Sequence, residues 1–559
     1  MIGYAGQSED PERFRRLARL AEPAARFVTH REDGVAIVLK RPPACRDERI
    51  HLAEFVGDEC RLLAFEGYLL EADASRGGLQ PAQWLLEQHA LKGLSALQSL
   101  NGAYSFCLFD RRERRAWIGS CIYGSVDLYY MREGGGVIFA TDLEPLLKLT
   151  ERPPGLATDQ LSSTFTCGAV YGGETLLQGV RRALPGGLVH VAPPNLIETP
   201  PGLLAQPPGD ELGEDEALEE LDRCFRTALA RLSCVTQRRV VLMGAGVDSS
   251  LAAVYLKLVT GELEAITVGM LTPPDETDDA RILTEALGGV HHASRFQMDG
   301  ADILAEIGEF VRVMEEPIWF GLGLLLMPMA RMGRTIADGF LSGIGADMFF
   351  GYSYCDPEDP MCAYDYFYRD LDPDCVRQVV RLSGPHPDEM VRQLYARLPG
   401  EPRLRNLHLD FLLQGALMIR LAARLARVHQ AEALFPYLDP DVIDLSLRMP
   451  FRLHQENKPL LRRLAARHYG DNLLQTRKVP FGAYPIKWIR AAGRLGPLLD
   501  LLDEKRTRQR GIYREKGLQR LTDSYRTGHP DRKWNLVLWQ LVVLELFCRR
   551  FVDLGSVKE

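Results

Sequence analysis

Short apolar runs separated by turn-forming residues dominate the first third of the chain. The runs have the length of β-strands, and glycine-rich turns such as residues 132–136 divide them. Two stretches with helical spacing, residues 10–21 and 80–90, lie between the runs. Many strands with few helices predict an α+β sandwich. The expected strands are residues 35–39, 62–65, 105–109, 116–120, 137–140 and 187–191.

A proline-rich stretch then interrupts this pattern. Prolines are frequent in residues 193–208, and such a composition is typical of a linker between domains. We therefore divide the chain into a first domain at residues 1–195, a linker at 196–213 and a second domain at 214–559.

Strands alternate with helices beyond the linker. This alternation indicates a doubly wound, mostly parallel sheet, whose ligands bind at the carboxyl ends of the strands. From about residue 403 the pattern is helical, and the apolar helix at 534–551 is expected in the core rather than in a membrane. The expected elements of the sheet are strands 240–243, 263–269, 291–296 and 335–341 and helices 215–232, 280–287 and 301–314.

Residues 238–250, RRVVLMGAGVDSS, are the stretch around which the second domain is organised. Its apolar run predicts a buried strand, and the turn Gly244–Gly246 lets the backbone approach a ligand closely. Such a turn before a helix presents backbone N–H groups to an anion. Ser249 and Ser250 add hydroxyl donors, and Asp248 could hold a metal ion that is also bound by phosphate oxygens. An ordinary strand-to-helix turn is the alternative interpretation.

The composition narrows the class of protein. The chain has 559 residues, of which 46% are hydrophobic and 25% charged, as in soluble globular proteins. A net charge of −8 does not favour non-specific binding to nucleic acid. Eleven cysteines without a CxxC pair indicate buried thiols in a reducing compartment. With no signal-like start and no membrane-spanning run, we expect a cytoplasmic protein without a membrane partner.

Four separated stretches carry further motifs: GAGVDS at 244–249, SGIGAD at 342–347 (with FGY at 350–352), AEALFPYLD at 431–439 and TRKVPFG at 476–482. In the same order they resemble SGGxDS, SGxGAD with FGGY, VEARVPFLD and RxKxxFG of the class B asparagine synthetase superfamily. That superfamily includes glutamine-dependent asparagine synthetase, β-lactam synthetase and lasso-peptide cyclases. The resemblance covers nearly the whole chain, and this order of motifs favours a ligand-binding loop over an ordinary turn.

The resemblance implies that the first domain is an Ntn-hydrolase-like glutaminase sandwich that has lost its chemistry. In glutamine-using members the residue after the initiator Met is a cysteine nucleophile. Ile2 stands at that position and has no lone pair to offer. Glu66 falls near the family's glutamine-binding asparagine, and a carboxylate lacks the donors of an amide. We therefore expect no hydrolysis of glutamine.

The second domain is then an adenine-nucleotide α-hydrolase-like (PP-loop) synthetase domain that uses ATP and Mg²⁺. The resemblance makes Asp248 and Asp347 the metal-holding carboxylates, which suits the oxygen preference of Mg²⁺. It makes Lys478 the cation that faces the phosphates, where an ammonium acts as a compact charge. Met243 and Val268 fit a hydrophobic core equally well. The predicted nucleotide-binding residues are Met243, Gly244, Ala245, Gly246, Asp248, Ser249, Ser250, Val268, Ser342 and Gly343.

Two positions depart from the family pattern. Gly244 replaces the first serine of the loop, which removes a hydroxyl donor worth on the order of 1 kcal/mol. Ile344 replaces a polar residue beside the reacting acyl group and cannot transfer a proton. The base could then be Tyr352, Tyr354 or Glu316, the amine could arrive deprotonated, or adenylation could be lost.

These features predict a glutamine-independent, ATP- and Mg²⁺-dependent enzyme of natural-product biosynthesis that forms amide bonds. It would activate a carboxylate as an acyl-adenylate for attack by an amine, within one small molecule or peptide or between two. An ammonia-using asparagine synthetase is one alternative, and a catalytically silent binding scaffold is another. A homodimer is compatible with the sequence.

Overall fold

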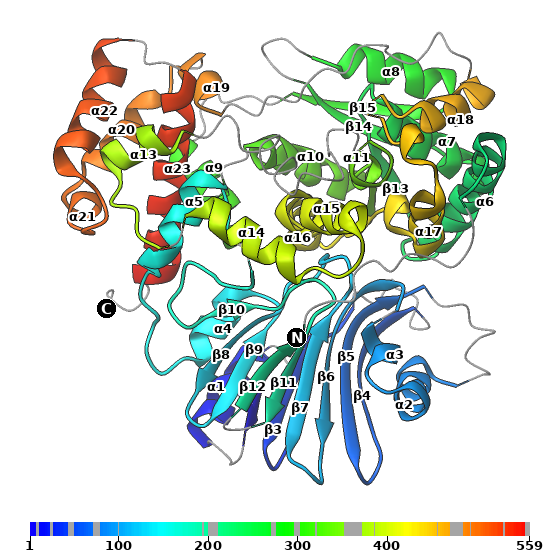
Figure 1. Ribbon diagram of the computed structural model, residues 1–559, viewed down its shortest axis with the longest axis horizontal. Coiled ribbons are helices and arrows are strands. Elements are labelled where there is room, and N and C mark those ends of the chain that lie inside the picture. Colours follow the sequence, from blue (N-terminus) through cyan, green and yellow to red (C-terminus); the bar gives the residue numbers. More distant parts are fainter. Residues whose placement is uncertain are drawn as a thin grey trace.

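The computed structural model describes residues 1–6, 11–22, 26–42, 50–70, 79–98, 100–170, 172–192, 195–199, 211–269, 275–295, 302–318, 321–351, 372–384, 386–455, 457–469, 485–491, 493–528 and 532–553. A β-sandwich forms one side of the molecule, and a parallel sheet with its helices sits on top of it (Figure 1). The C-terminal helices pack beside the parallel-sheet domain (Figure 1).

Two antiparallel sheets of six strands form the N-terminal sandwich, in the orders β10-β8-β9-β1-β3-β2 and β12-β11-β7-β6-β5-β4. The apolar sides of both sheets contribute to a common core, in which Ile37, Phe109, Ile118 and Phe139 are buried. The strands are β1 (Ile2–Gly6), β2 (Phe27–Glu32), β3 (Val35–Lys40), β4 (His51–Gly57), β5 (Arg61–Leu69), β6 (Gly102–Asp110), β7 (Arg115–Ser120), β8 (Tyr129–Glu133), β9 (Gly136–Ala140), β10 (Arg181–Arg182), β11 (Leu188–Ala192) and β12 (Asn195–Thr199).

The predicted strands of this domain are all present, but the pattern missed several others. Strand β1, IGYAG, is rich in small residues of low β propensity, yet it pairs with β3 on one side and β9 on the other. Its position in the middle of a sheet therefore decides its structure. The short helices of the domain are α1 (Pro11–Leu20), α2 (Pro81–Lys92), α3 (Ser95–Gln98), α4 (Leu143–Leu149) and α5 (Leu161–Thr166).

Strand β12 begins just before the expected linker and extends into it. It pairs antiparallel with β11 from Asn195 opposite Ala192 to Thr199 opposite Leu188. The sheet of the first domain therefore continues to Thr199. Helix α6 (Glu214–Ser233) then opens the second domain, close to the predicted start.

The second domain holds a five-stranded parallel sheet in the order β15-β14-β13-β16-β17. The chain adds strands on one side of β13 and then on the other, so its direction of growth reverses between β13 and β16. In such sheets the ligand crevice lies outside the carboxyl ends of the strands at this reversal. The strands are β13 (Arg239–Leu242), β14 (Glu264–Gly269), β15 (Val290–Arg295), β16 (Gly339–Leu341) and β17 (Glu432–Leu434).

Three features of this domain show the main differences from the prediction. Strand β16 begins at Gly339 rather than at residue 335, because helix α10 (Leu322–Ile336) runs past that point. Strand β17 lies in the part predicted to be helical and pairs parallel with β16. Helices also begin before residue 403, at α13 (Pro373–Val379) and α14 (Pro387–Arg397).

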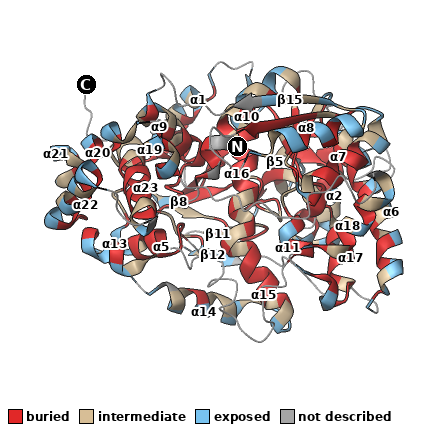
Figure 2. Ribbon diagram, turned by 90° about the horizontal axis from the view of Figure 1, so that it is seen from above, coloured by how far each residue is buried: buried red, intermediate tan, exposed pale blue. Residues whose placement is uncertain are grey.

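Helices enclose the sheet and continue to the C-terminus. Helix α23 (Arg532–Phe547) is a core element, as predicted, and its Trp539 is fully buried and donates to the carbonyl of Ile318 at 3.2 Å. Both α16 (Ala416–Val428) and α23 are largely buried (Figure 2). The remaining helices are α7 (Val247–Thr260), α8 (Thr277–Ala286), α9 (Ile303–Met314), α11 (Ala346–Phe350), α15 (Pro402–Asp410), α16 (Ala416–Val428), α17 (Pro440–Arg448), α18 (Pro459–Tyr469), α19 (Pro485–Ala491), α20 (Leu495–Asp503), α21 (Lys505–Arg508), α22 (Glu515–Thr527) and α23 (Arg532–Phe547).

Among the described residues, none of these helices combines the length and the hydropathy that crossing a bilayer requires.

Candidate active site

Two loops meet at the carboxyl ends of β13 and β16. The first, residues 243–246, leads into α7, and the second, residues 342–345, leads into α11. Gly343 packs so closely on the start of α7 that a Cβ there would lie 2.9 Å from the backbone nitrogen of Ser249. A side chain at this position would push the loops apart, so glycine is what lets them touch. The two predicted loops thus form one site.

The ammonium of Lys458 forms ion pairs with both aspartates that were predicted from the sequence to hold a metal. Its Nζ donates to both carboxylate oxygens of Asp248, at 2.8 and 2.6 Å, and lies 2.6 Å from Oδ1 of Asp347. Burial acts to lower the pKa of this ammonium, but Asp248 and Asp347 outweigh it and hold its pKa above the usual value. Each of the three residues comes from a different connection, so only the folded chain brings them together.

Sequence reasoning missed Lys458. It lies outside the motifs quoted above and immediately precedes Pro459, the first residue of α18. It has a positive φ of 51°, which is uncommon for a residue with a side chain. The only signal in the sequence was a lysine before a proline that can begin a helix, which is too common to single out a ligand.

Asp248 and Asp347 fit a magnesium ion. Because a single ammonium contacts both carboxylates, both also lie within reach of a common cation. Carboxylate oxygens suit Mg²⁺, which usually takes one or two protein carboxylates together with phosphate oxygens. The Asp347 side chain is 61% exposed, which leaves room for phosphate oxygens and water.

The first loop is held in shape by its own hydroxyl groups. Ser249 Oγ accepts from the backbone N–H of Gly244 at 3.1 Å and lies 3.2 Å from the Gly244 carbonyl. Ser250 is buried, and its hydroxyl donates to the carbonyl of Gly246 at 2.6 Å. In this structure the two serines therefore brace the turn, and Ser250 points into the helix.

A carboxylate from the next connection reaches this loop. Glu276, at the start of α8, accepts from the backbone N–H of Ala245 at 3.3 Å. Partial burial raises the pKa of the Glu276 carboxyl; the Ala245 N–H opposes this rise, and Asp279 and Asp275 add to it. Glu276 was not among the predicted site residues.

Besides Ala245 and Ser250, three of the predicted nucleotide contacts are buried. Met243 and Val268 belong to the main hydrophobic core, the alternative that the sequence left open for them. Ser342 is also buried, and its Oγ accepts from the backbone N–H of Ile344 at 3.3 Å. The half-buried side chain of Ile344 packs against the same core.

Buried polar groups hold α11, the helix that carries Asp347, in position. The carbonyl of Phe349, in α11, accepts from His454 Nδ1 at 2.9 Å and from the hydroxyl of Ser446. Arg403 donates to His454 Nε2 at 3.1 Å, so the ring is neutral with its proton on Nδ1. Burial and the charge of Arg403 lower the pKa of His454 to about 3. This network holds Asp347 in place at neutral pH.

Lys478 and Tyr352, together with Tyr354, lie outside the residues that the structure describes. Their predicted roles remain predictions. The third candidate base, Glu316, is described and follows α9.

Glu316 lies in an ionic cluster between the two domains. It accepts from Arg182 Nη1 at 3.0 Å, from Arg420, and from the backbone N–H of Val170 at 3.1 Å. Burial acts to raise the pKa of Glu316, but Arg420 and Arg182 outweigh it and hold the pKa low. A carboxylate so paired is a weak base. The structure thus gives Glu316 partners that suit a role in joining the domains.

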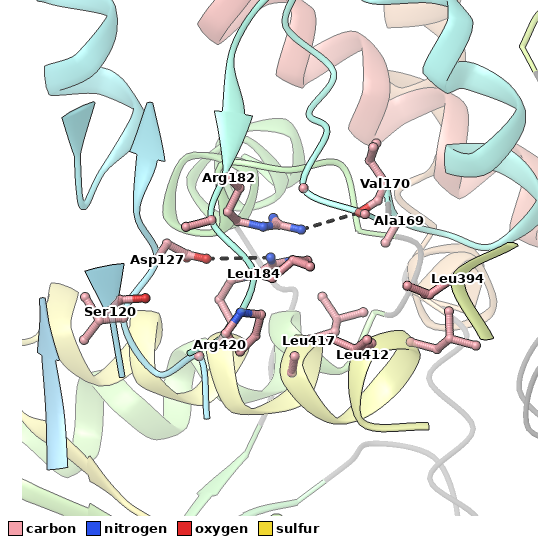
Figure 3. A pocket seen from close by; sticks show the side chains of 18 residues that line it. Ser120, Asp127, Ala169, Val170, Arg182, Leu184, Leu394, Leu412, Leu417 and Arg420 are labelled. Carbon is pink, nitrogen blue, oxygen red and sulfur yellow. Dashed lines mark hydrogen bonds and ion pairs between the residues drawn. The ribbon is translucent and has the colours of Figure 1, made fainter. Parts of the chain in front are cut away.

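A small cavity of about 50 Å³ adjoins this cluster. Arg182 and Asp127 of the first domain and Arg420 and Leu417 of α16 line it (Figure 3). Arg420 lies 3.7 Å from Asp127, and Arg424, one turn further along α16, donates to the same carboxylate at 2.6 Å. Buried ion pairs therefore hold the sandwich to the second domain at this point.

The end of β1 occupies the place where the resemblance puts the glutaminase nucleophile. Ile2 is buried in the sheet, paired with Val38 and Ala140. The α-amino group of Met1 donates to Glu66 Oε1 at 2.8 Å and to Thr141 Oγ1 at 2.9 Å. Glu66 is therefore engaged with the protein's own amino group.

The fold and the paired loops define a class of two-domain proteins in which a sandwich of two antiparallel sheets precedes a parallel sheet with two touching loops at its carboxyl end. The family profile described as Asparagine synthase matches residues 220–549, and the one described as Glutamine amidotransferase domain matches residues 81–199. The chain belongs to the asparagine synthase family, and the predicted membership of the class B asparagine synthetase superfamily is confirmed. Members of this family are ATP-dependent ligases that form AMP and pyrophosphate.

Named relatives agree with this assignment. Proteins of Mycobacterium bovis and Mycobacterium tuberculosis, both named as putative glutamine-hydrolysing asparagine synthetases, are 24% identical over 533 residues, which covers 84% of this chain and 79% of theirs. A similarly named protein of Methanocaldococcus jannaschii is 21% identical over 276 residues, or 48% of this chain and 52% of its own.

A solved glutamine phosphoribosylpyrophosphate amidotransferase from B. subtilis, in complex with ADP and GMP, is 13% identical and covers 53% of this chain and 80% of its own. Its TM-score is 0.25, so it adds nothing to the assignment of the fold.

Proposed function

We propose that this protein is a glutamine-independent, ATP- and Mg²⁺-dependent synthetase that forms an amide bond in natural-product biosynthesis. Its substrate is a small molecule or peptide that carries a carboxylate and an amine, on one molecule or on two. The observation that supports this proposal best is the convergence of Asp248, Asp347 and Lys458 at the phosphate-binding loop.

The proposed reaction has two steps. A substrate carboxylate oxygen attacks the α-phosphorus of ATP, and pyrophosphate leaves to give an acyl-adenylate. The amine then attacks the acyl carbon, loses a proton, and displaces AMP. Asp248 and Asp347 would hold Mg²⁺, which neutralises charge on the triphosphate. The backbone N–H groups of the first loop and the ammonium of Lys458 would bind the phosphates, with Lys478 as a second cation.

Glutamine independence rests on the first domain. Ile2 has no nucleophilic atom, and the carboxylate of Glu66 is held by the Met1 amino group at 2.8 Å. Binding glutamine there would require that contact to break. In this proposal the amine that forms the amide comes from the substrate itself.

The proton of the attacking amine needs an acceptor. Ile344 cannot accept it, and the ion pairs of Glu316 make that residue a weak base. The remaining routes are Tyr352, Tyr354 or an amine that arrives deprotonated. A pH profile of the second step reports the pKa of the group that must lose its proton, whether a tyrosine or the amine itself.

The test is release of pyrophosphate from ATP by the purified protein, scanned over carboxylates with and without amines. A carboxylate that triggers release without glutamine or ammonia, followed by amide formation with a substrate amine, supports the proposal. Release only with aspartate and ammonia would instead identify an ammonia-using asparagine synthetase. Nucleotide binding without release for every carboxylate would favour a catalytically silent scaffold, the alternative suggested by Gly244 and Ile344.

A further inference from the structure

The nucleotide loop already holds an anion supplied by the protein. Glu276 lies in the connection between β14 and α8, and β14 is the strand next to β13, which leads into the loop. The Oε2 atom of Glu276 accepts from the backbone N–H of Ala245 at 3.3 Å. A backbone N–H in such a turn is a group that a phosphate oxygen would use. A carboxylate and a phosphate therefore compete for the same donor.

The surroundings of Glu276 make its charge costly. The side chain is half-buried, and Asp279 and Asp275 add like charge beside it. A triphosphate placed on the loop would bring further negative charge against this carboxylate, and such like-charge contacts are unfavourable where water is partly excluded.

The structure also links Glu276 to Gly244, the glycine that stands where the family pattern has a serine. A Cβ on Gly244 would lie 2.8 Å from Glu276 Oε2, closer than a side-chain carbon and an oxygen normally approach. The φ angle of Gly244 is not in the positive region that favours glycine, so its backbone conformation alone does not require glycine. A Cβ at this position would make the end of the Glu276 side chain shift, so glycine leaves the carboxylate room beside the loop.

We propose that Glu276 is an internal competitor of the nucleotide phosphates, which weakens their binding to the loop, and that Gly244 is the residue that admits it. This inference rests on the proposed function, because it takes the loop to be the phosphate site. Glu276 is a specificity-determining residue in this view: it disfavours phosphate groups that arrive without a cation to offset the added charge.

The test uses Glu276→Gln in the full-length protein. The amide keeps the shape and can still accept from the Ala245 N–H, so only the charge is removed. Calorimetry with inorganic pyrophosphate, and separately with ATP and Mg²⁺, measures affinity. We expect pyrophosphate to bind about tenfold more tightly to the variant, with a smaller gain for Mg²⁺-ATP, because the metal already neutralises part of the phosphate charge.

Asp278→Asn is the matched control. Asp278 lies in the first turn of α8, just after Glu276; its side chain is 89% exposed and lies 3.7 Å from Arg281. The Asp278→Asn substitution removes the same charge at a position that does not contact the loop, so pyrophosphate affinity should change less than twofold. A melting curve for each variant shows whether the fold is retained.

Gly244→Ser provides an independent arm. The added Cβ should displace the carboxylate, so Glu276→Gln should have little effect in the Gly244→Ser background. Unchanged or weaker binding in a folded Glu276→Gln protein would overturn the inference, and so would full additivity of the two changes. If the parent and both variants bind neither pyrophosphate nor ATP, the proposed function fails instead.

Discussion

Removing the ammonium of Lys458 is the sharpest perturbation of the proposed site. Lys458→Met keeps most of the length and volume of the side chain and deletes its charge. The Lys458 side chain is 4% exposed, and its Nζ contacts both carboxylates at 2.6 to 2.8 Å. Without it, Asp248 and Asp347 lose the cation that lies between them.

The cost follows from burial. Removing one partner of a fully buried ion pair costs about 3–5 kcal/mol. The carboxylates here are only partly shielded, since Asp248 is 26% and Asp347 61% exposed, so water screens part of the repulsion. We therefore expect a loss of about 2–3 kcal/mol in the free energy of unfolding of this domain. In a domain of this size that corresponds to a drop of about 3–4 °C in Tm.

Thermal unfolding with and without Mg²⁺ measures this effect. In the parent the ammonium already lies between the carboxylates, so Mg²⁺ without nucleotide should change Tm little. In Lys458→Met, millimolar Mg²⁺ should recover much of the lost stability, because the ion can bind the freed carboxylates. Lys257→Met is the control, since Lys257 lies on α7 with Asp248 and its ammonium donates to the Gly288 carbonyl at 3.2 Å. That control should melt close to the parent.

The reasoning fails if Lys458→Met melts like the parent, or if Mg²⁺ stabilises the parent and the variant equally. Asp347→Asn in the Lys458→Met background sharpens the test. Removing one carboxylate should relieve the repulsion and abolish the rescue by Mg²⁺, whereas additive effects would show that the two side chains do not act through each other.

Other perturbations test the remaining parts of the site. Asp347→Asn alone should keep the fold and lose Mg²⁺-dependent turnover, and parental rates across a Mg²⁺ titration would refute the metal assignment. Lys478→Met should bind ATP nearly normally and form product at least about tenfold more slowly, because the charge acts in the transition state; an unchanged rate would remove Lys478 from the site. The parent should release no glutamate from glutamine, since Ile2 supplies no thiol, and release above a boiled control would contradict this. Burial raises the pKa of the Glu315 carboxyl from 4.5 to about 7, against the effect of Arg424. The folded state then holds the extra proton between those values, so this group's contribution to stability falls as pH rises through that window. Glu315→Gln should remove this dependence, and equal slopes of Tm against pH in parent and variant would show that Glu315 does not titrate there.

Local pattern was sufficient for much of the fold. The apolar run at 240–243, the glycines after it and the helical spacing beyond predict a strand, a turn and a helix, and β13 and α7 lie there. The alternation of strands and helices predicts a parallel sheet with ligands at its carboxyl ends, because side-chain periodicity and connection lengths are local properties. The identity of one residue, Ile2, predicts a first domain that does not hydrolyse glutamine, and this stays a prediction.

Tertiary structure decided what the local pattern could not. Strands β1 and β17 have weak patterns of their own and exist because neighbouring strands supply their hydrogen bonds. Lys458 joins the site because α18 packs against α6 and α7, which brings it to Asp248, 210 residues away in the chain. Glu276 meets the loop at residues 243–246 because β14 lies beside β13, and Glu316 meets Arg182 and Arg420 because the two domains touch. Charge pairing over such distances leaves no periodic trace in a sequence, since it depends on where separate elements pack.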